Sequence, residues 1–382
     1  MPDAYKWLER SLATIGQAGW HRTEKTVETL NAPFIKVDGL EAINFGSNDY
    51  LGLATEYRIK MATIAAINQH GTGSTGSRLV TGHRQLHRDL ERSIAELKES
   101  QDALVFSSGY LANLGTIAAL VNSRDLILSD QYNHSSLKNG ARLSQATIKE
   151  YPHNDCQALE NLLKQQRGLY RRALILSDGV FSMDGDLCNL PELLNLSQIY
   201  ESMLLIDEAH ATAVLGRTGA GSFEHWGLSG VEIVQTGTLS KALGSLGGYV
   251  AGSATLIDYL RNRAASWIYT TGLSPGDTAA ALKAIAIVKQ EPEHLQRLTE
   301  NISYFGNLLG TKAQSPIFPV VLKKTTEATE LSSILLEKGF FVPAIRPPTV
   351  PTSRLRISLM AKHEKEHLDY LYELLVRHIQ KH

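Results

Sequence analysis

One lysine of this sequence stands in a setting that favours covalent chemistry. Lys241 follows the apolar run 233–236 within Gly237-Thr-Leu-Ser-Lys-Ala-Leu-Gly244, where no acidic side chain is a sequence neighbour. An isolated lysine is usually solvated, but a lysine that is removed from water has a lowered pKa and can form a Schiff base with a carbonyl. The segment therefore offers a candidate nucleophile that needs a partner with a carbonyl group.

A carboxylate and two imidazoles also follow apolar runs. Asp207 comes directly after the run 203–206, His210 lies three residues later, and His134 follows the run 126–128. Taken alone, an Asp-x-x-His string is usually structural, and His134 could be an ordinary surface side chain. In a parallel sheet, however, ligands bind beyond the carboxyl ends of the strands, so these groups would lie at one edge.

A strand-to-helix turn in the same region could hold a phosphate. The segment Phe106-Ser-Ser-Gly109-Tyr110 follows another apolar run and opens a helix. Free N–H groups and the helix dipole suit a phosphate there, although an ordinary turn also needs glycine. Pyridoxal phosphate requires a lysine for its aldehyde, a carboxylate for its pyridine nitrogen, a phosphate cradle and a flat group over its ring. These roles can be filled in turn by Lys241, Asp207, the Gly109–Tyr110 turn and His134, while His210 could hydrogen-bond the ring oxygen.

Two nucleotide-binding signatures occur as strings but in the wrong context. Gly71-Thr-Gly-Ser-Thr-Gly76 matches G-x-G-x-x-G, yet it follows a helical pattern rather than a strand. As a phosphate loop it lacks the Lys-Ser/Thr pair, because Ser77 and Arg78 come next. Asp207-Glu-Ala-His210 reproduces the acidic string of nucleotide-driven helicases. Without the loop lysine, a nucleotide-driven motor or binding module is the weaker alternative.

Short apolar runs alternate with amphipathic stretches through the middle of the chain. The leucines and isoleucine between 86 and 97, for example, recur with helical spacing. This alternation predicts an α/β fold with a mostly parallel sheet in a large domain, 51–290. A turn-rich N-terminal segment, 1–50, precedes it, and a smaller α/β domain, 291–382, follows it. Strands of the large domain are expected at 103–106, 126–128, 173–176, 203–206, 233–236 and 249–251. Helices of the small domain are expected at 294–309, 327–338 and 364–378, and its strands at 318–322 and 355–359.

The composition is typical of a globular protein. The chain has 382 residues, of which 43% are hydrophobic and 20% charged, which excludes collagen-like, coiled-coil and disordered proteins. A net charge of -1 argues against nucleic-acid and membrane-surface partners. Cys156 and Cys188 stand in unrelated contexts, so neither a disulfide framework nor a metal site is expected. The N-terminus lacks the pattern of a signal peptide and no run suits a membrane span, so a cytoplasmic protein is expected.

Together these motifs resemble those of the α-oxoamine synthases, pyridoxal-phosphate enzymes with the aspartate aminotransferase-like fold (fold type I). The resemblance runs along nearly the whole chain. It implies condensation of an amino acid with an acyl thioester, loss of carbon dioxide and release of the thiol carrier. Ala344-Ile-Arg-Pro-Pro-Thr-Val-Pro351 resembles the motif of the subgroup that joins L-alanine to a pimeloyl thioester in biotin biosynthesis. The other matching motifs are Ser47-Asn-Asp-Tyr-Leu-Gly-Leu53, Gly71-Thr-Gly-Ser-Thr-Gly-Ser-Arg78, Ser177-Asp-Gly-Val-Phe-Ser-Met-Asp-Gly185, Asp207-Glu-Ala-His210 and Thr238-Leu-Ser-Lys241.

The resemblance also implies a role for each matched residue. Lys241 would hold the cofactor and then act as the general base at the Cα of alanine, and His134 would stack on the ring and assist proton transfer to the acyl oxygen. The family's site lies between the subunits of a homodimer, so Thr270 and Thr271 would reach the partner's phosphate. Further cofactor contacts, some of them catalytic, are implied for Gly109, Tyr110, Ser182, Asp207, His210 and Thr238.

Substrate contacts follow from the same resemblance. Arg356 matches the arginine that pairs with the amino-acid carboxylate, a task that suits a planar guanidinium, and Asn48 would lie beside it. Arg22 and Thr349 match positions that line the acyl-thioester site, and the resemblance implies a substrate contact for His134 as well. The alternatives within the family use glycine or serine with other acyl thioesters, as glycine C-acetyltransferase does. The sequence leaves open whether coenzyme A or an acyl carrier protein delivers the acyl group.

Overall fold

The computed structural model describes residues 3–228 and 230–379, which form two compact units. The larger unit comprises 48–316 and 360–362, and the smaller one comprises the described part of 1–47, 317–359 and 363–382. These bounds differ from the sequence-based division, because 291–316 belongs to the larger unit and the N-terminal segment packs with C-terminal strands. No helix within the described residues combines the length and apolar character needed to cross a membrane.

A seven-stranded sheet forms the middle of the larger unit. Its strands, in chain order, are β4 (Asp102–Phe106), β5 (Leu126–Asp130), β6 (Thr147–Tyr151), β7 (Ala173–Asp178), β8 (Met203–Asp207), β9 (Val234–Thr238) and β10 (Gly248–Gly252). Their order across the sheet is β4-β10-β9-β8-β7-β5-β6, and only β10 runs antiparallel to its neighbours. The predicted, mostly parallel sheet is therefore confirmed. Strand β6 was missed because it is an edge strand with a polar, half-exposed sequence.

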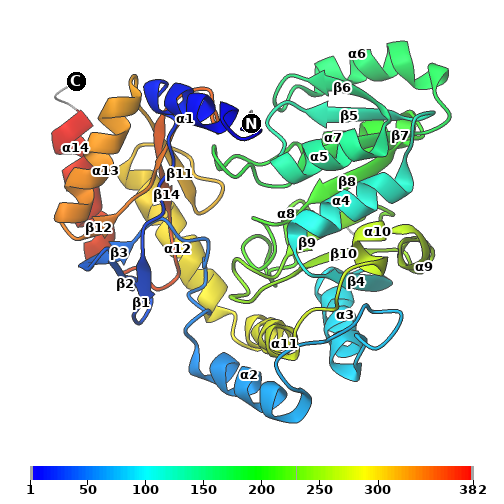
Figure 1. Ribbon diagram of the computed structural model, residues 1–382, viewed down its shortest axis with the longest axis horizontal. Helices are drawn as coiled ribbons and strands as arrows, with labels where there is room; N and C mark the ends of the chain where they lie inside the picture. The colour runs from blue at the N-terminus through cyan, green and yellow to red at the C-terminus, as the bar shows by residue number, and fades with distance from the viewer. Residues whose placement is uncertain (1–2, 229, 380–382) are drawn as a thin grey trace. The chain divides into compact units, whose positions relative to one another are not determined.

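Helices cover both faces of this sheet (Figure 1). On β7, Leu174 and Leu176 pack in the same apolar cluster as α4 and α5, whereas Ala173 and Ile175 pack in the cluster of α6 and α7. Burial of alternate side chains on opposite faces explains why the strands are continuous apolar runs. The α-helices of the larger unit are α2 (Tyr57–His70), α3 (Gln85–Leu97), α4 (Gly109–Leu120), α5 (Ser135–Ser144), α6 (Cys156–Gln166), α7 (Leu190–Ile199), α8 (Ser222–His225), α9 (Ala254–Arg263), α10 (Ala265–Ile268), α11 (Pro275–Gln290) and α12 (Glu293–Leu308), and a 3₁₀ turn, η1, spans Arg167–Leu169.

The smaller unit contains two small sheets, ordered β1-β2-β3-β12 and β11-β14-β13. The parallel pairing of Phe340–Phe341 with Ile43 and Asn44 joins the N-terminal segment to the C-terminal part of the chain. His363 stacks on Phe45, and burial lowers its pKa to about 3, so it is a neutral core residue. The elements are α1 (Trp7–Gln17), β1 (Val27–Thr29), β2 (Phe34–Val37), β3 (Leu40–Asn44), β11 (Ile317–Val321), α13 (Thr325–Glu337), β12 (Phe340–Phe341), β13 (Ala344–Ile345), β14 (Arg354–Ser358) and α14 (Lys365–Ile379).

A fully buried ion pair anchors the segment that follows β8. Lys98 Nζ lies 2.8 Å from Glu208 Oε2 and also donates to the carbonyl of Ala220. The backbone N–H of Ser222 donates to the same Oε2 at 2.9 Å, and its hydroxyl donates to Oε1. A buried carboxylate is tolerated only when charge and hydrogen bonds compensate it, and here both conditions are met.

We expect Lys98→Met to lower the free energy of unfolding by about 3–5 kcal/mol, because Glu208 would keep a buried charge without its cation. Lys289→Met is the matched control. Its Nζ pairs with Glu96 at the surface, so we expect a loss below about 1 kcal/mol. Urea titrations followed by circular dichroism measure both values, and equal losses would contradict the assignment.

Candidate active site

A cavity of about 230 Å³ lies in the larger unit, at the carboxyl ends of β5, β7, β8 and β9. Because these strands are parallel, the segments that follow them meet at one edge of the sheet. Seven of the residues that the sequence singled out line this cavity, namely Gly109, Tyr110, His134, Asp207, His210, Thr238 and Lys241. The structure therefore brings together an amine, a carboxylate and two imidazoles.

A chain of hydrogen bonds orients the amine of Lys241. Its Nζ lies 2.6 Å from His210 Nε2, and His210 Nδ1 lies 2.6 Å from the hydroxyl of Tyr50. That hydroxyl donates to Asn48 Oδ1 at 3.1 Å, so it accepts from Nδ1–H of His210. His210 then presents the lone pair of Nε2 to Lys241 and holds the amine inside the cavity.

Asp207 ends β8 and is almost completely buried. Its Oδ2 accepts from Asn113 Nδ2 at 2.7 Å, and its Oδ1 accepts from the backbone N–H of Ala209 at 2.9 Å. Asn113 also donates to the hydroxyl of Ser136 at 2.9 Å, whereas its buried Oδ1 has no hydrogen-bond partner in the described part of the chain. The two donors fix the orientation of the carboxylate, and one amide acceptor remains at the cavity wall.

A second buried acid, Asp178, supports His134. Its Oδ2 accepts from the backbone N–H of His134 at 2.8 Å. Burial, and then the charge of Asp207, raises the pKa of Asp178 well above its usual range. Burial also lowers the pKa of His134, with the charge of Lys241 acting in the same direction and that of Asp207 opposing it. Because its Nδ1 accepts from the N–H of Ser136, the neutral imidazole of His134 carries its proton on Nε2.

Helix α4 begins at the cavity with a tightly packed glycine turn. The first N–H groups of a helix have no acceptor within it, and the positive end of the dipole lies there. A Cβ on Gly109 would lie 3.1 Å from the Cβ of Thr238, and a Cβ on Gly248 would collide with the backbone nitrogen of Gly109. The absence of these side chains lets the turn pack against β9 and β10, where its N–H groups are suited to bind an anion.

Four predicted residues of the larger unit lie outside the lining of this cavity. Ser182 lies in the loop between β7 and α7, and Thr270 and Thr271 lie between α10 and α11. Asn48 is linked to Lys241 through Tyr50 and His210. The cofactor and substrate contacts that the resemblance implies for these four residues therefore remain predictions.

The remaining predicted residues belong to the smaller unit. Arg356 lies on β14, is buried, and donates to the hydroxyl of Ser358 at 2.7 Å. Arg22 donates to the hydroxyl of Thr349 at 3.1 Å, and both line a separate cavity of about 460 Å³. The predicted acyl-site pair is thus in contact although 327 positions separate the two residues.

Sequence reasoning assigned no individual role to Asn113, Asp178 or Tyr50. Asp178 could have been found, because it ends a buried strand as Asp207 does. Asn113 lies four residues after Gly109 and therefore shares one face of helix α4. The contact of Tyr50 with His210 joins residues 160 positions apart, and no local pattern signals it.

The sequence of this protein is similar to those of known proteins. The model of the aminotransferase class I and II family matches residues 41–375. The chain belongs to this family. A protein of Trichormus variabilis, provisionally named 8-amino-7-oxononanoate synthase, is 58% identical over 382 residues, which cover 98% of this chain and 99% of that protein. A protein of Nostoc punctiforme with the same name is 60% identical over 380 residues, which cover 98% and 96% of the two chains.

Solved structures of related enzymes share the fold. Serine palmitoyltransferase from S. paucimobilis, as a variant with bound pyridoxal phosphate and myriocin, superposes with a TM-score of 0.91 at 27% identity and covers 99% of this chain and 98% of its own. The 8-amino-7-oxononanoate synthase of Francisella tularensis superposes with a TM-score of 0.78 at 28% identity and covers 89% and 98%. The predicted resemblance, the fold type I architecture and the prediction of a pyridoxal-phosphate enzyme are confirmed.

The cavity also fits pyridoxal phosphate in the chemistry of its donors. Lys241 offers an amine for the aldehyde, and the buried carboxylate of Asp207 suits a protonated ring nitrogen. The N-terminus of α4 suits the phosphate. The unpaired Oδ1 of Asn113 leaves a hydrogen-bond acceptor at the wall for a ligand. An amine, a carboxylate and a helix N-terminus that suit the cofactor are therefore present at one edge of the sheet.

Outside the lining of this cavity, His153 bridges two carboxylates. Its Nδ1 lies 3.1 Å from Asp130 Oδ1, at the end of β5, and its Nε2 lies 2.9 Å from Asp186 Oδ2. Burial would lower the pKa of His153, but hydrogen bonds and charges from the two acids outweigh it and raise this pKa to about 10. The charged imidazole ties the end of β5 to the loop between β7 and α7, which carries Ser182.

Because the pKa of His153 is higher in the folded than in the unfolded chain, its contribution to stability is complete below about pH 6.5 and disappears as the pH rises towards 10. We expect His153→Gln to lower the free energy of unfolding by about 1–2 kcal/mol at pH 6 and by much less at pH 10. Denaturant titrations at both values measure the difference. His225→Gln, at an exposed position, is the matched control, and a loss for His153→Gln that does not depend on pH would contradict the ion pairs.

Proposed function

We propose that this protein catalyses the decarboxylative condensation of L-alanine with a pimeloyl thioester to give 8-amino-7-oxononanoate, carbon dioxide and free thiol, as a cytoplasmic step of biotin biosynthesis. The observation that carries the proposal is the convergence of Lys241, Asp207 and His134 in one cavity. The motif 344–351 and the names of relatives at 58% and 60% identity support this choice of substrates.

The reaction forms a bond between the Cα of alanine and the acyl carbon, and breaks the thioester C–S bond and the bond to the alanine carboxylate. Pyridoxal phosphate, when bound, supplies the electron sink that stabilises negative charge at Cα. Nζ of Lys241 removes the Cα proton and returns a proton after carbon dioxide has left. His210 directs this amine through Nε2, which lies 2.6 Å from Nζ.

The other cavity residues hold charge and protons in place. Asp207, which is oriented by Asn113 and Ala209, would keep a proton on the ring nitrogen of the bound cofactor. His134, neutral and protonated on Nε2, would lie over the ring of the bound cofactor and would donate a hydrogen bond to the acyl oxygen while negative charge develops there during attack on the thioester. The phosphate would be held by Gly109, Tyr110, Ser182 and Thr238, and by Thr270 and Thr271 of the partner subunit.

Charge in the smaller unit supports an anionic acyl donor. The cavity that contains Arg22 and Thr349 is also lined by Lys25 and Arg346, and no acidic side chain occurs among its described lining residues. A pimeloyl thioester carries a carboxylate at the far end of its chain and phosphate on its carrier, which such a lining attracts. Arg356 and Asn48 are proposed to bind the carboxylate of alanine.

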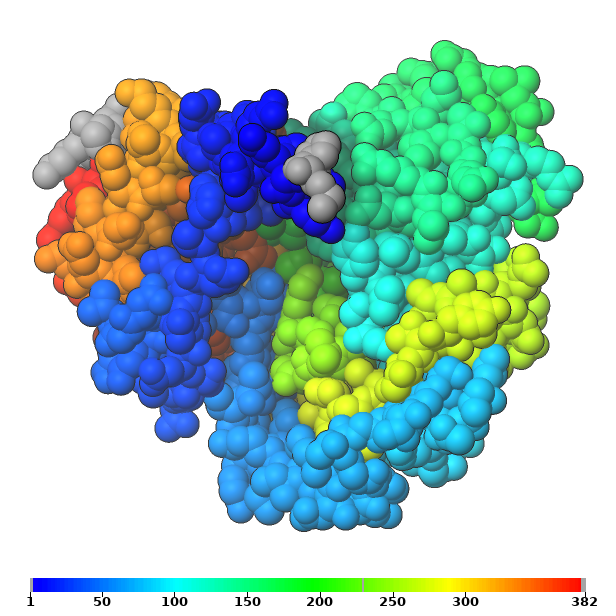
Figure 2. Space-filling view, in the orientation of Figure 1, coloured from blue at the N-terminus to red at the C-terminus, as the bar shows by residue number. Residues whose placement is uncertain are grey.

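Exposed apolar side chains on the larger unit support a homodimer. Tyr57 and Ile64 on α2 are 68% and 49% exposed, and Val80 and Tyr269 are 80% and 84% exposed. Figure 2 shows α2, the segment that follows it and residues 265–275 side by side at the surface. An apolar surface of this kind is typical of a subunit interface, and Thr270 and Thr271 adjoin it.

The structure does not support the alternative hypothesis of a nucleotide-driven motor or binding module. The glycine string 71–76 follows helix α2 and not a strand. Glu208, which would serve magnesium and water in a nucleotide-driven motor, is buried against Lys98. Neither string has the setting that nucleotide binding requires.

We expect Lys241→Ala to lower the rate of thiol release by about 10³-fold or more, because no other amine lines the cavity among the described residues. Lys289→Ala, at a surface ion pair, is the matched control and should keep wild-type activity. Stopped assays with both variants, loaded with the cofactor, measure the effect. Normal turnover by Lys241→Ala would refute the proposed chemistry.

The substrates are tested by thiol release from pimeloyl-coenzyme A, with L-alanine, glycine and L-serine supplied in separate reactions. We expect release that depends on alanine, because the motif 344–351 resembles that of the alanine-using subgroup. If alanine shifts the absorbance of the cofactor but no thiol is released, pimeloyl-acyl carrier protein replaces coenzyme A in the same assay. Failure with both carriers, or release that depends on glycine alone, would contradict the proposal.

A further inference from the structure

We infer that Arg78 is a positioning residue that holds the segment carrying Thr270 and Thr271, and thereby acts on phosphate binding in the partner subunit's site. The inference rests on the proposed function, in which these two threonines reach across the dimer. It concerns a residue that lines no part of the cavity described above.

Arg78 uses its whole guanidinium group inside the protein. The side chain is 2% exposed, Nη1 donates to the carbonyl of Val105 at 3.0 Å, and Nη2 lies 2.6 Å from Glu91 Oε1. Nε donates to His83 Nδ1 at 3.0 Å, and the guanidinium lies over the ring of Trp267, 5.3 Å from its centroid. A lysine could replace the charge but not this planar fork and stacked face.

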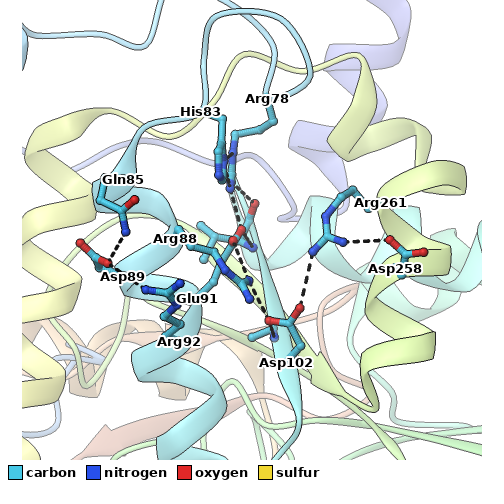
Figure 3. Close-up of polar contacts among 12 residues, drawn as sticks. Arg78, His83, Gln85, Arg88, Asp89, Glu91, Arg92, Asp102, Asp258 and Arg261 are labelled. Atoms are coloured by element: carbon cyan, nitrogen blue, oxygen red, sulfur yellow. Dashed lines mark hydrogen bonds and ion pairs between the residues drawn. The ribbon is translucent and has the colours of Figure 1, made fainter.

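The surrounding groups are arranged to accept from Arg78. Burial, and then the charge of Arg78, lowers the pKa of His83, so this imidazole stays neutral and accepts through Nδ1. Figure 3 shows Arg78 and His83 together, with the polar contacts of Arg88, Asp102 and Arg261 beyond Glu91. Buried ion pairs add little net stability compared with apolar residues of similar size. A network this complete therefore suggests a role in setting geometry.

The backbone beside Arg78 is paired with the threonine segment. Ser77 forms an antiparallel bridge with Thr271, and the N–H of Gly272 donates to the carbonyl of Gly76 at 3.0 Å. A Cβ on Gly272 would lie 3.0 Å from Cδ of Arg78 and would collide with the carbonyl of Gly82. The Arg78 side chain thus lies directly against the backbone that follows Thr271.

The end of the threonine segment is held as firmly as its middle. The carbonyl of Leu273 accepts from His87 Nε2 at 2.8 Å and from the hydroxyl of Ser74. Burial lowers the pKa of His87 to about 4, so it remains a neutral donor at physiological pH. The carbonyl of Thr271 accepts from the hydroxyl of Ser107, yet the Thr271 residue itself is exposed. Because its backbone is held on both sides, the exposed Thr271 is preorganised to contact a ligand bound in another subunit.

The first test separates phosphate binding from cofactor binding in general. We expect Arg78→Lys to weaken binding of pyridoxal phosphate by about tenfold, because hydrogen bonds to the phosphate lose their alignment. Binding of pyridoxal, which lacks the phosphate, should stay unchanged. Equilibrium dialysis with both probes measures the two affinities. Equal weakening of both, or of neither, would overturn the inference.

The second test asks whether Arg78 acts across the dimer. Heterodimers of an Arg78→Lys chain and a Lys241→Ala chain are isolated with two affinity tags. One of their two sites then combines an intact Lys241 with an intact Arg78 from the other chain, so we expect about half of wild-type activity. Activity no higher than that of the Arg78→Lys homodimer would show that Arg78 acts within its own subunit, and would overturn the inference.

Two further proteins keep the result unambiguous. A heterodimer of Thr271→Val and Lys241→Ala chains tests the shared site alone, and it should also regain about half of the activity. If it regains activity and the Arg78 heterodimer does not, only this inference fails; if neither does, the shared site of the proposed function fails too. Should Arg78→Lys not fold, Trp267→Leu removes the stacked face alone and is expected to show the same loss specific to the phosphate.

Discussion

The parallel pairing of β5, β7, β8 and β9 constrains the candidate active site, because it brings the carboxyl ends of four strands to one edge. In this register Asp178 lies opposite Asp207 on the neighbouring strand, and Lys241 follows the next strand along. Groups from distant parts of the sequence thus meet without long or specialised loops. The same pairing brings two acids together, and burial, followed by the charge of Asp207, raises the pKa of Asp178.

Buried charge is tolerated here because each charged group has partners. Asp207 is held by Asn113 and Ala209, and the next residue, Glu208, is held by Lys98 and Ser222. The two neighbouring acids serve different purposes. One presents a carboxylate to the cavity, whereas the other anchors the segment behind it.

Close backbone contacts shape the elements proposed to bind phosphate as strongly as side chains do. A Cβ on Gly248 would collide with the start of α4, and a Cβ on Gly272 would collide with Gly82 beside Arg78. Such contacts place N–H groups and exposed hydroxyls on backbone that cannot move freely. This rigidity is what a site needs if it is to bind an anion without reorganising.

Local patterns in the sequence determined the strand order along the chain, the strand-end positions of Asp207, His134 and Lys241, and the family resemblance carried by five motifs and the segment 344–351. They could do so because buried parallel strands are continuous apolar runs, and their ends are visible as the first polar residue. Only the tertiary structure decided that Asn113 orients Asp207, that Tyr50 orients His210, and that Arg78 lies against the threonine segment. These contacts join residues 94, 160 and nearly 200 positions apart, where no periodicity or local spacing connects the partners. The compact units were likewise decided by packing, because a parallel pair between β3 and β12 unites segments from opposite ends of the chain.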